Sequence, residues 1–169
     1  MENFLNGLKE LLPYIIIIIV IIVIRTFFFT PVLVNGDSMK PTLKDKQLLL
    51  LNKYDKKLKR FDIVVLTREN NEKLIKRIIG LPGEYVEYKN GKLYIDGKIV
   101  KDNFAKFTND FFLEAISLEL KEIPKGKYLV LGDNRNNSID SRTIGLIDEK
   151  DISGKITFSI WPIKKIKNA

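Results

Sequence analysis

One serine and one lysine are the residues of this chain whose types and surroundings could do chemistry together. Ser38 lies in the turn-prone sequence Asn-Gly-Asp-Ser-Met-Lys-Pro-Thr, just beyond a very apolar stretch. A serine hydroxyl is a weak nucleophile until a base takes its proton, and histidine, the usual base, is absent from all 169 residues. The base of a reactive Ser38 would then be a lysine, a carboxylate or an amino terminus, and Lys76, between Ile75 and Ile78 on an expected strand, stands out among the lysines. The pair predicts acyl transfer through a serine-bound intermediate.

The candidate base needs surroundings that suppress its charge. An unperturbed lysine titrates near ~10.4, so a base working at neutral to mildly alkaline pH needs a pKa lowered by about two units, or roughly 3 kcal/mol. Burial supplies a shift of this size when the side chain faces the interior. From spacing alone, the alternative of a solvated surface charge stays open for Lys76, as for any other lysine of the chain.

Three motifs contain or follow these two residues. Residues 38–42 read Ser-Met-Lys-Pro-Thr, residues 76–83 read Lys-Arg-Ile-Ile-Gly-Leu-Pro-Gly, and residues 132–142 read Gly-Asp-Asn-Arg-Asn-Asn-Ser-Ile-Asp-Ser-Arg. In type, in order and in their place behind an apolar segment, the motifs resemble those of the bacterial type I signal peptidases, which are serine/lysine proteases. The resemblance extends from about residue 25 to about residue 145.

The resemblance implies a role for each matched residue. Ser38 would be the nucleophile and Lys76 the general base of a serine endopeptidase, with the Ser38 backbone N–H as an oxyanion donor. Ser138 would orient the lysine through its hydroxyl. The other residues implied to fix the third motif are Asp133, Arg135 and the ion-paired Asp140 and Arg142. Some members carry a serine two positions before the nucleophile, where this chain has Gly36, so the second oxyanion donor stays open.

No metal and no cofactor is expected. The absence of cysteine and histidine excludes thiol proteases, disulfides and the common zinc sites. A calcium loop built on Asp133, Asn137 and Asp140 would lack a bidentate glutamate at the required spacing.

The implied substrates are secretory precursor proteins, cut after small residues at Ala-x-Ala sites. Such an enzyme needs two shallow apolar pockets and a strand edge that holds the peptide extended. By resemblance, the pockets would be lined by Val34, Met39, Leu43, Leu74 and Ile75. Main chain that would pair with substrate lies at Asn35, Gly36 and Asp37 and at Lys73, Leu74 and Ile75. Each apolar residue of this set could equally belong to the core.

The apolar segment predicts a single transmembrane helix. The expected divisions are a short cytoplasmic amino terminus over residues 1–10, an anchor over 11–30 and a catalytic domain over 31–169. About 14 apolar residues span only roughly 21 Å, so reaching the ~30 Å hydrocarbon core requires the helix to continue through Phe29 with Arg25 snorkelling to the interface. Pro13 would fit the first helical turn. A buried strand would be shorter, and a cleavable signal peptide would be followed by a small-x-small site.

Two indications of the orientation disagree. Arg25, Lys40, Lys44 and Lys46 lie beyond the apolar run, which by the positive-inside rule would place the large domain in the cytoplasm. The resemblance implies the opposite: a single-pass protein of the cell membrane with its catalytic domain on the extracytoplasmic side, functionally linked to the secretion translocase. The net charge of +8 would suit nucleic acid and anionic membrane lipids equally well, and the nearby apolar segment favours the lipids, so nucleic acid is not an expected partner.

Beyond residue 31 the pattern predicts a mainly β fold. Asn90-Gly91 and Asp96-Gly97 are strong hairpin turns, and short apolar runs lie between turn residues throughout. The expected strands are 47–51, 62–67, 73–79, 85–88, 92–95, 127–131 and 154–160. They indicate an antiparallel sheet or barrel-like domain, of the signal peptidase type by resemblance. Residues 102–121 fit either a strand or a short helix.

Two other functions fit parts of the pattern. A specialised serine/lysine peptidase, acting on pilin or conjugation substrates, would share the motifs; a self-cleaving repressor would need a DNA-binding domain that the residues before Ser38 do not accommodate. A non-catalytic, membrane-tethered basic binding protein would show no activity dependent on Ser38 or Lys76, and it leaves the order of the three motifs unexplained.

Overall fold

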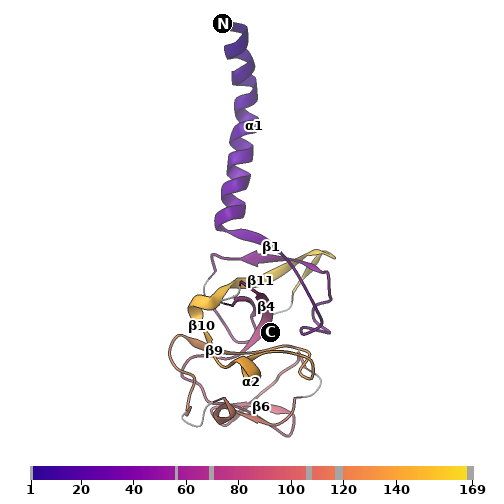
Figure 1. The fold of residues 1–169 in the computed structure, drawn as a ribbon, viewed down its shortest axis with the longest axis vertical. Helices are drawn as coiled ribbons and strands as arrows, with labels where there is room; N and C mark the ends of the chain where they lie inside the picture. The colour runs from indigo at the N-terminus through magenta and orange to yellow at the C-terminus, as the bar shows by residue number, and fades with distance from the viewer. Residues whose placement is uncertain (1, 56, 69–70, 106–107, 117–119, 167–169) are drawn as a thin grey trace.

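The computed structural model describes residues 2–55, 57–68, 71–105, 108–116 and 120–166. A helix, α1 (Glu2–Phe27), projects from a β domain that contains the rest of the described chain (Figure 1). The side chains of α1 that are described, residues 10–23, are all exposed. Within the described residues, no helix is both long enough and apolar enough to cross a membrane.

The helix differs from its expected bounds. It begins at Glu2 rather than at residue 11, so Pro13 lies inside α1 and not in its first turn. A proline there lacks the N–H that would bond to the carbonyl four residues earlier, and flanking residues such as Glu, Leu and Lys favour helix strongly enough to continue past it. At the other end, Phe29 already belongs to the first strand. The Arg25 side chain lies outside the described residues.

The β domain consists of short strands with few helical turns. The strands of the larger sheet are β1 (Phe29–Leu33), β2 (Leu48–Asn52), β3 (Ile63–Thr67), β4 (Lys73–Gly80), β9 (Lys127–Leu131), β10 (Ile147–Asp148), β11 (Ile152–Trp161) and β12 (Lys164–Lys165). Those of the smaller sheet are β5 (Val86–Lys89), β6 (Lys92–Ile95), β7 (Lys98–Val100) and β8 (Phe111–Phe112). The helical turns are η1 (Leu113–Ala115), α2 (Ser141–Ile144) and η2 (Glu149–Asp151).

Every strand pair among the described residues is antiparallel, which confirms the mainly β, antiparallel part of the predicted fold class. The larger sheet has the order β1-β2-β11-β3-β4-β9-β10, with β12 beside β11. β4 pairs with β3 over residues 73–77 but with β9 only from Arg77 onward, so its first half has one open edge. The strand β1 forms one end of the order, so among the described strands it has a second open edge. Both edges lie near the nucleophile segment.

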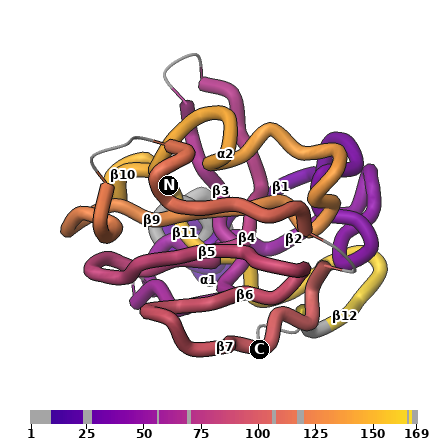
Figure 2. Tube along the Cα trace, turned by 90° about the horizontal axis from the view of Figure 1, so that it is seen from below, coloured from indigo at the N-terminus to yellow at the C-terminus, as the bar shows by residue number. Residues whose placement is uncertain are grey.

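The smaller sheet lies at the end of the domain opposite α1 (Figure 1) and has the order β7-β6-β5-β8. Figure 2 shows β5, β6 and β7 side by side. Both predicted hairpin turns are present: φ is positive at Asn90 and Gly91 and again at Asp96 and Gly97, as a two-residue turn between twisted strands requires. The ambiguous segment 102–121 forms β8 and η1 where it is described, and residues 106–107 and 117–119 lie outside the description.

Strand alternation divides β4 between the two faces of its sheet. Lys76 shares a face with Leu74 and Ile78, whereas Arg77 shares the other face with Ile75 and Ile79. Ile75, Ile78 and Ile79 belong to three different clusters of buried apolar residues. The two consecutive cations are thus buried in different surroundings.

Candidate active site

Ser38 and Lys76 are in direct contact. The Lys76 Nζ donates a hydrogen bond to Ser38 Oγ at 2.9 Å, joining β4 to the turn that follows β1. Lys76 is only 2% exposed, while Ser38 is partly exposed. The distance is within the range for proton transfer between a nucleophile and its base.

The surroundings of Lys76 favour its neutral form. Burial lowers the pKa of Lys76, and the more distant charges of Asp140, Glu72 and Asp133 only partly oppose this effect. Among the described residues Lys76 forms no ion pair, and its ammonium group donates instead to the Ser38 hydroxyl. A buried amine with no carboxylate in direct contact is the arrangement that lets a lysine act as a base.

The main chain around Ser38 is held by Asn134. The Asn134 backbone N–H donates to the Ser38 carbonyl at 2.9 Å, and its side-chain amide donates to the Asp37 carbonyl at 3.1 Å. Gly36 has φ of +88°, which favours glycine, and its N–H bonds to Asp45 Oδ1 at 2.8 Å. In the described part of the chain, no hydrogen bond uses the Ser38 N–H, which leaves this donor for another acceptor.

Asp133 forms a buried two-point ion pair with Arg77. The Arg77 Nε and Nη2 donate to its two carboxylate oxygens at 2.8 and 2.7 Å, and both side chains are fully buried. Arg77 also donates to the Phe61 carbonyl at 2.8 Å, and its guanidinium carbon lies 3.6 Å from the centre of the Phe104 ring. The Thr42 hydroxyl donates to the same carboxylate. The third motif is thereby tied to the first and the second.

Asp140 and Arg142 form an ion pair within the same motif. Two bonds of 2.8 Å join them, and Asp140 also accepts the Gly132 N–H at 2.9 Å. Burial acts to raise the pKa of Asp140, but Arg142 and the Gly132 N–H outweigh it and hold that pKa below its ordinary value. Asp140 also caps the N-terminus of α2. This carboxylate is therefore ionised and fixes the loop over Ser38.

Arg135 is bound by residues far from it in sequence. Its guanidinium donates to Asp102 at 2.7 Å and to Thr108 at 2.5 Å, and its Nε donates to the Gly132 carbonyl at 2.9 Å. The Tyr88 ring lies beneath it, with the guanidinium carbon 5.1 Å from the ring centre.

The Ser138 hydroxyl is buried and, among the described residues, has no hydrogen-bond partner of ordinary geometry. The bond to Lys76 that the family resemblance implies is therefore not formed in this structure. Ser138 does lie close enough to Asp140 to help lower its pKa. Gly132 makes room for it, because a Cβ at this position would collide with Ser138 Oγ and with the Ser38 carbonyl.

A cleft of about 470 Å³ opens beside Ser38. It is lined by residues 31–35 on one side and 71–76 on the other, with Ser38 and Met39 between them. The expected substrate residues that the cleft contains are Val34, Asn35, Met39, Lys73, Leu74 and Ile75. Gly36, Asp37 and Leu43 do not line it, and Leu43 is a core residue only 1% exposed. Val34 and Met39 belong to the same core cluster, so pocket and core share residues.

Comparison with known proteins identifies the family. Residues 8–161 match the family described as signal peptidase, peptidase S26. The chain belongs to this family. It is 38% identical to Signal peptidase IB of Staphylococcus aureus, over 95% of this chain and 94% of that protein. It is 39% identical to Signal peptidase I of Bacillus caldolyticus, over 90% and 91% of the two chains.

A solved structure agrees with this assignment. The crystal structure of a signal peptidase I from Enterococcus faecalis V583 matches 60% of this chain and 97% of its own, with a TM-score of 0.55 and 38% identity. The chain is thus a serine endopeptidase that cleaves signal peptides from secreted precursors. This excludes the non-catalytic binding protein.

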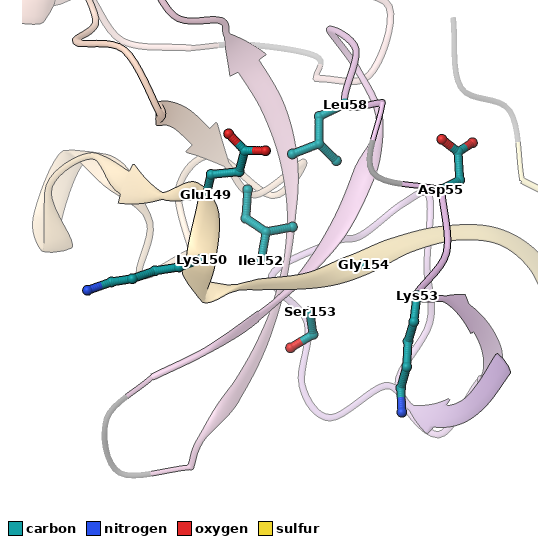
Figure 3. A pocket seen from close by; sticks show the side chains of 8 residues that line it. All are labelled: Lys53, Asp55, Leu58, Glu149, Lys150, Ile152, Ser153 and Gly154. Atoms are coloured by element: carbon teal, nitrogen blue, oxygen red, sulfur yellow. The ribbon is translucent and has the colours of Figure 1, made fainter. Parts of the chain in front are cut away.

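A separate hollow in this signal peptidase lies between the loop after β2 and the start of β11 (Figure 3). Its volume is about 330 Å³, and it is lined by Lys53, Asp55, Leu58, Glu149, Lys150, Ile152, Ser153 and Gly154. None of them is a predicted site residue, and Asp55 is paired with Lys155 at 2.6 Å. The hollow shares no lining residue with the cleft at Ser38.

Sequence reasoning assigned no role to several residues that contact the predicted residues of the Ser38 site, among them Asn134, Thr42 and Asp102. Asn134 lies inside the third motif, and its place between two charged residues was a usable signal. Thr42 belongs to the first motif but had no assigned role. Asp102 gave no local signal, because its partner Arg135 is 33 positions away.

Proposed function

We propose that Ser38 is the nucleophile and Lys76 the general base of this signal peptidase. The single observation that carries the proposal is the 2.9 Å contact between Ser38 Oγ and a buried lysine whose pKa is lowered by burial. Neutral Lys76 takes the hydroxyl proton as Oγ attacks the scissile carbonyl, then returns it to the leaving amine. Water, activated by the same lysine, hydrolyses the acyl-enzyme and frees Ser38.

The oxyanion of the tetrahedral intermediate would bind the Ser38 N–H. This donor has no acceptor among the described residues. Gly36 keeps the approach to it open, since it has no side chain and, apart from its two chain neighbours, no described residue has an atom within 4 Å of the place where a Cβ would stand. Ser138 is the proposed lysine-orienting hydroxyl. Its unpaired buried oxygen, which costs about 1–3 kcal/mol, is the kind of exception that marks functional sites.

The substrate would bind as an added strand between β1 and β4. The open edge of β4 over residues 73–76 and the segment 31–35 face the same cleft, so an extended peptide could pair with both and complete a barrel-like sheet. Val34, Met39, Leu74 and Ile75 give this cleft apolar walls. Small residues on alternate positions of such a strand would fit against these apolar side chains, as in precursors with Ala-x-Ala sites.

The proposed location is the cell membrane, with α1 as a single-pass anchor and the β domain on the extracytoplasmic side. The family is membrane-associated, and residues 11–23 of α1 carry exposed apolar side chains apart from Pro13 as the helix leaves the β domain. Membrane lipids around α1 and the secretion translocase are the proposed partners beyond the secretory precursors themselves.

The test is cleavage of a secretory precursor with an Ala-x-Ala site by the detergent-solubilised full chain. Ser38→Ala and Lys76→Ala should each abolish cleavage. Two matched controls are Ser159→Ala, a fully buried serine bonded to Gln47, and Lys155→Ala, a buried lysine that is ion-paired with Asp55. Activity retained in either dyad variant would refute the mechanism. Activity confined to a few non-secretory precursors would favour the specialised processing peptidase.

A further inference from the structure

Asn134, which holds the nucleophile turn, lies between two buried arginine contacts. On one side Asp133 is bound by Arg77 at 2.7 and 2.8 Å, and on the other Arg135 is bound by Asp102 and Thr108. All polar groups of these contacts are buried or nearly so. The main chain at Asn134 is therefore fixed from both neighbours, and with it the two donors that reach the Asp37 and Ser38 carbonyls.

One segment outside the three motifs contacts both arginines. Asp102 accepts from Arg135 at 2.7 Å, and Phe104, two residues on, places its ring 3.6 Å from the Arg77 guanidinium carbon. The Phe104 N–H bonds back to the other Asp102 oxygen at 3.0 Å, which couples the two contacts. The segment thus supports the loop of the third motif directly at Arg135 and, through Arg77, at Asp133.

The smaller sheet holds this segment in place. The Tyr88 hydroxyl on β5 donates to the same Asp102 oxygen at 2.7 Å, and the Tyr88 ring supports Arg135 from below. Burial acts to raise the pKa of Asp102, but Arg135 and Tyr88 outweigh it and keep the carboxylate ionised. The Arg135 guanidinium binds most strongly to a carboxylate that is ionised and held in a fixed orientation.

We propose that Asp102, which is supported by Tyr88 and shares Arg135 with Thr108, is a positioning residue for the nucleophile. By holding Arg135 it fixes Asn134, and Asn134 holds the Ser38 turn at the distance from Lys76 that proton transfer requires. The smaller sheet thereby serves catalysis without contacting substrate. The inference rests on the proposed function, in which Ser38 and Lys76 are nucleophile and base.

The first experiment separates positioning from general stability. Asp102→Asn should lower kcat by about 10- to 100-fold, since a displacement of ~1 Å at the reacting atoms costs a factor of this order, with KM changed by less than about 3-fold. The matched control is Glu84→Gln, which breaks the half-buried Arg60 pair of 2.5 Å elsewhere between the two sheets. Both variants are compared at a temperature where circular dichroism shows them fully folded. Equal kcat in Asp102→Asn and Glu84→Gln would overturn the proposal.

The second experiment tests the route through Asn134. Asn134→Ala removes the side-chain bond to the Asp37 carbonyl but keeps the backbone bond to Ser38, so adding Asp102→Asn to it should cost less in kcat than Asp102→Asn costs in wild type. A full additional loss would show that Asp102 acts by another route. Thr108→Val should show a smaller loss than Asp102→Asn, and Asp102→Glu should restore part of the activity.

Ser38→Ala distinguishes a failure of the dyad from a failure of the positioning role. If Ser38→Ala retains activity, the dyad itself fails. If Ser38→Ala is inactive while Asp102→Asn matches wild type, only the positioning role fails.

Discussion

Two consecutive cations on β4 have opposite surroundings. Arg77 has several partners: it contacts both oxygens of Asp133, the Phe61 carbonyl and the Phe104 ring. It has no exposed surface. Lys76 is almost as deeply buried, yet among the described residues it forms no ion pair and donates to the neutral Ser38 hydroxyl. Both side chains are basic in type, and strand alternation alone places them on different faces.

The difference shows how one strand supplies both a structural charge and a reactive amine. A buried cation with a carboxylate partner stays charged and joins elements, whereas one without a partner is shifted toward its neutral form by desolvation. Arginine suits the first role because its fork binds a carboxylate at two points, and lysine suits the second because its pKa yields to burial. Exchanging the lysine and the arginine should therefore abolish both the base and the structural ion pair.

Lys76→Arg should abolish activity, because a guanidinium stays protonated and cannot accept the Ser38 proton. The expected loss in kcat/KM is about 10³-fold or more, measured by precursor cleavage. A variant with an intact fold and substantial activity would show that charge at this position, rather than an accepting lone pair, is what the reaction needs.

Asp133→Ala should be the largest destabilisation, because it leaves Arg77 buried without its partner. Breaking one half of a buried pair costs about 3–5 kcal/mol in the free energy of unfolding, measured by urea denaturation of the full chain. If this variant were as stable as wild type, the contacts between Arg77 and Asp133 would contribute nothing to the free energy of unfolding, and the two cations would not differ as described.

The free energy of unfolding and kcat/KM should both change with pH as Lys76 titrates. Because burial lowers its pKa in the folded protein, the unfolded chain binds more protons between that value and about 10.4. Lys76 therefore makes the free energy of unfolding increase with pH across this window, and Lys76→Met should lack the increase. In wild type, kcat/KM should fall about tenfold per pH unit below the folded pKa of Lys76. A flat profile from pH 6 to 10 would contradict the assignment.

An exposed ion pair should contribute less to stability than the buried pair of Arg77 and Asp133. Lys127 and Asp148 are 2.8 Å apart but more than a third exposed, so solvent screens their attraction. Asp148→Asn should change Tm by less than about 2 °C and leave kcat unaltered. A shift as large as that of Asp133→Ala would mean that burial does not govern the strength of these contacts.

The sequence alone determined a large part of this protein. Without histidine, a base for Ser38 had to be sought among the lysines, the carboxylates and the amino terminus. The hairpins at Asn90-Gly91 and Asp96-Gly97 followed from the need for positive φ. Such features are local: they depend on residue type and on neighbours in the chain. The predicted strands at 92–95 and 127–131 have the same bounds in the structure for the same reason.

Tertiary structure decided which groups meet. The contact of Ser38 with Lys76 spans 38 positions, and those of Asp133 with Arg77 and of Arg135 with Asp102 span 56 and 33. Such pairings depend on how the sheets pack, which short-range patterns do not encode. The suppressed charge of Lys76 is a property of burial, and so is the demand that Arg77 be paired. The sequence supplied two cations in a row, and only the fold made one a structural charge and the other a base.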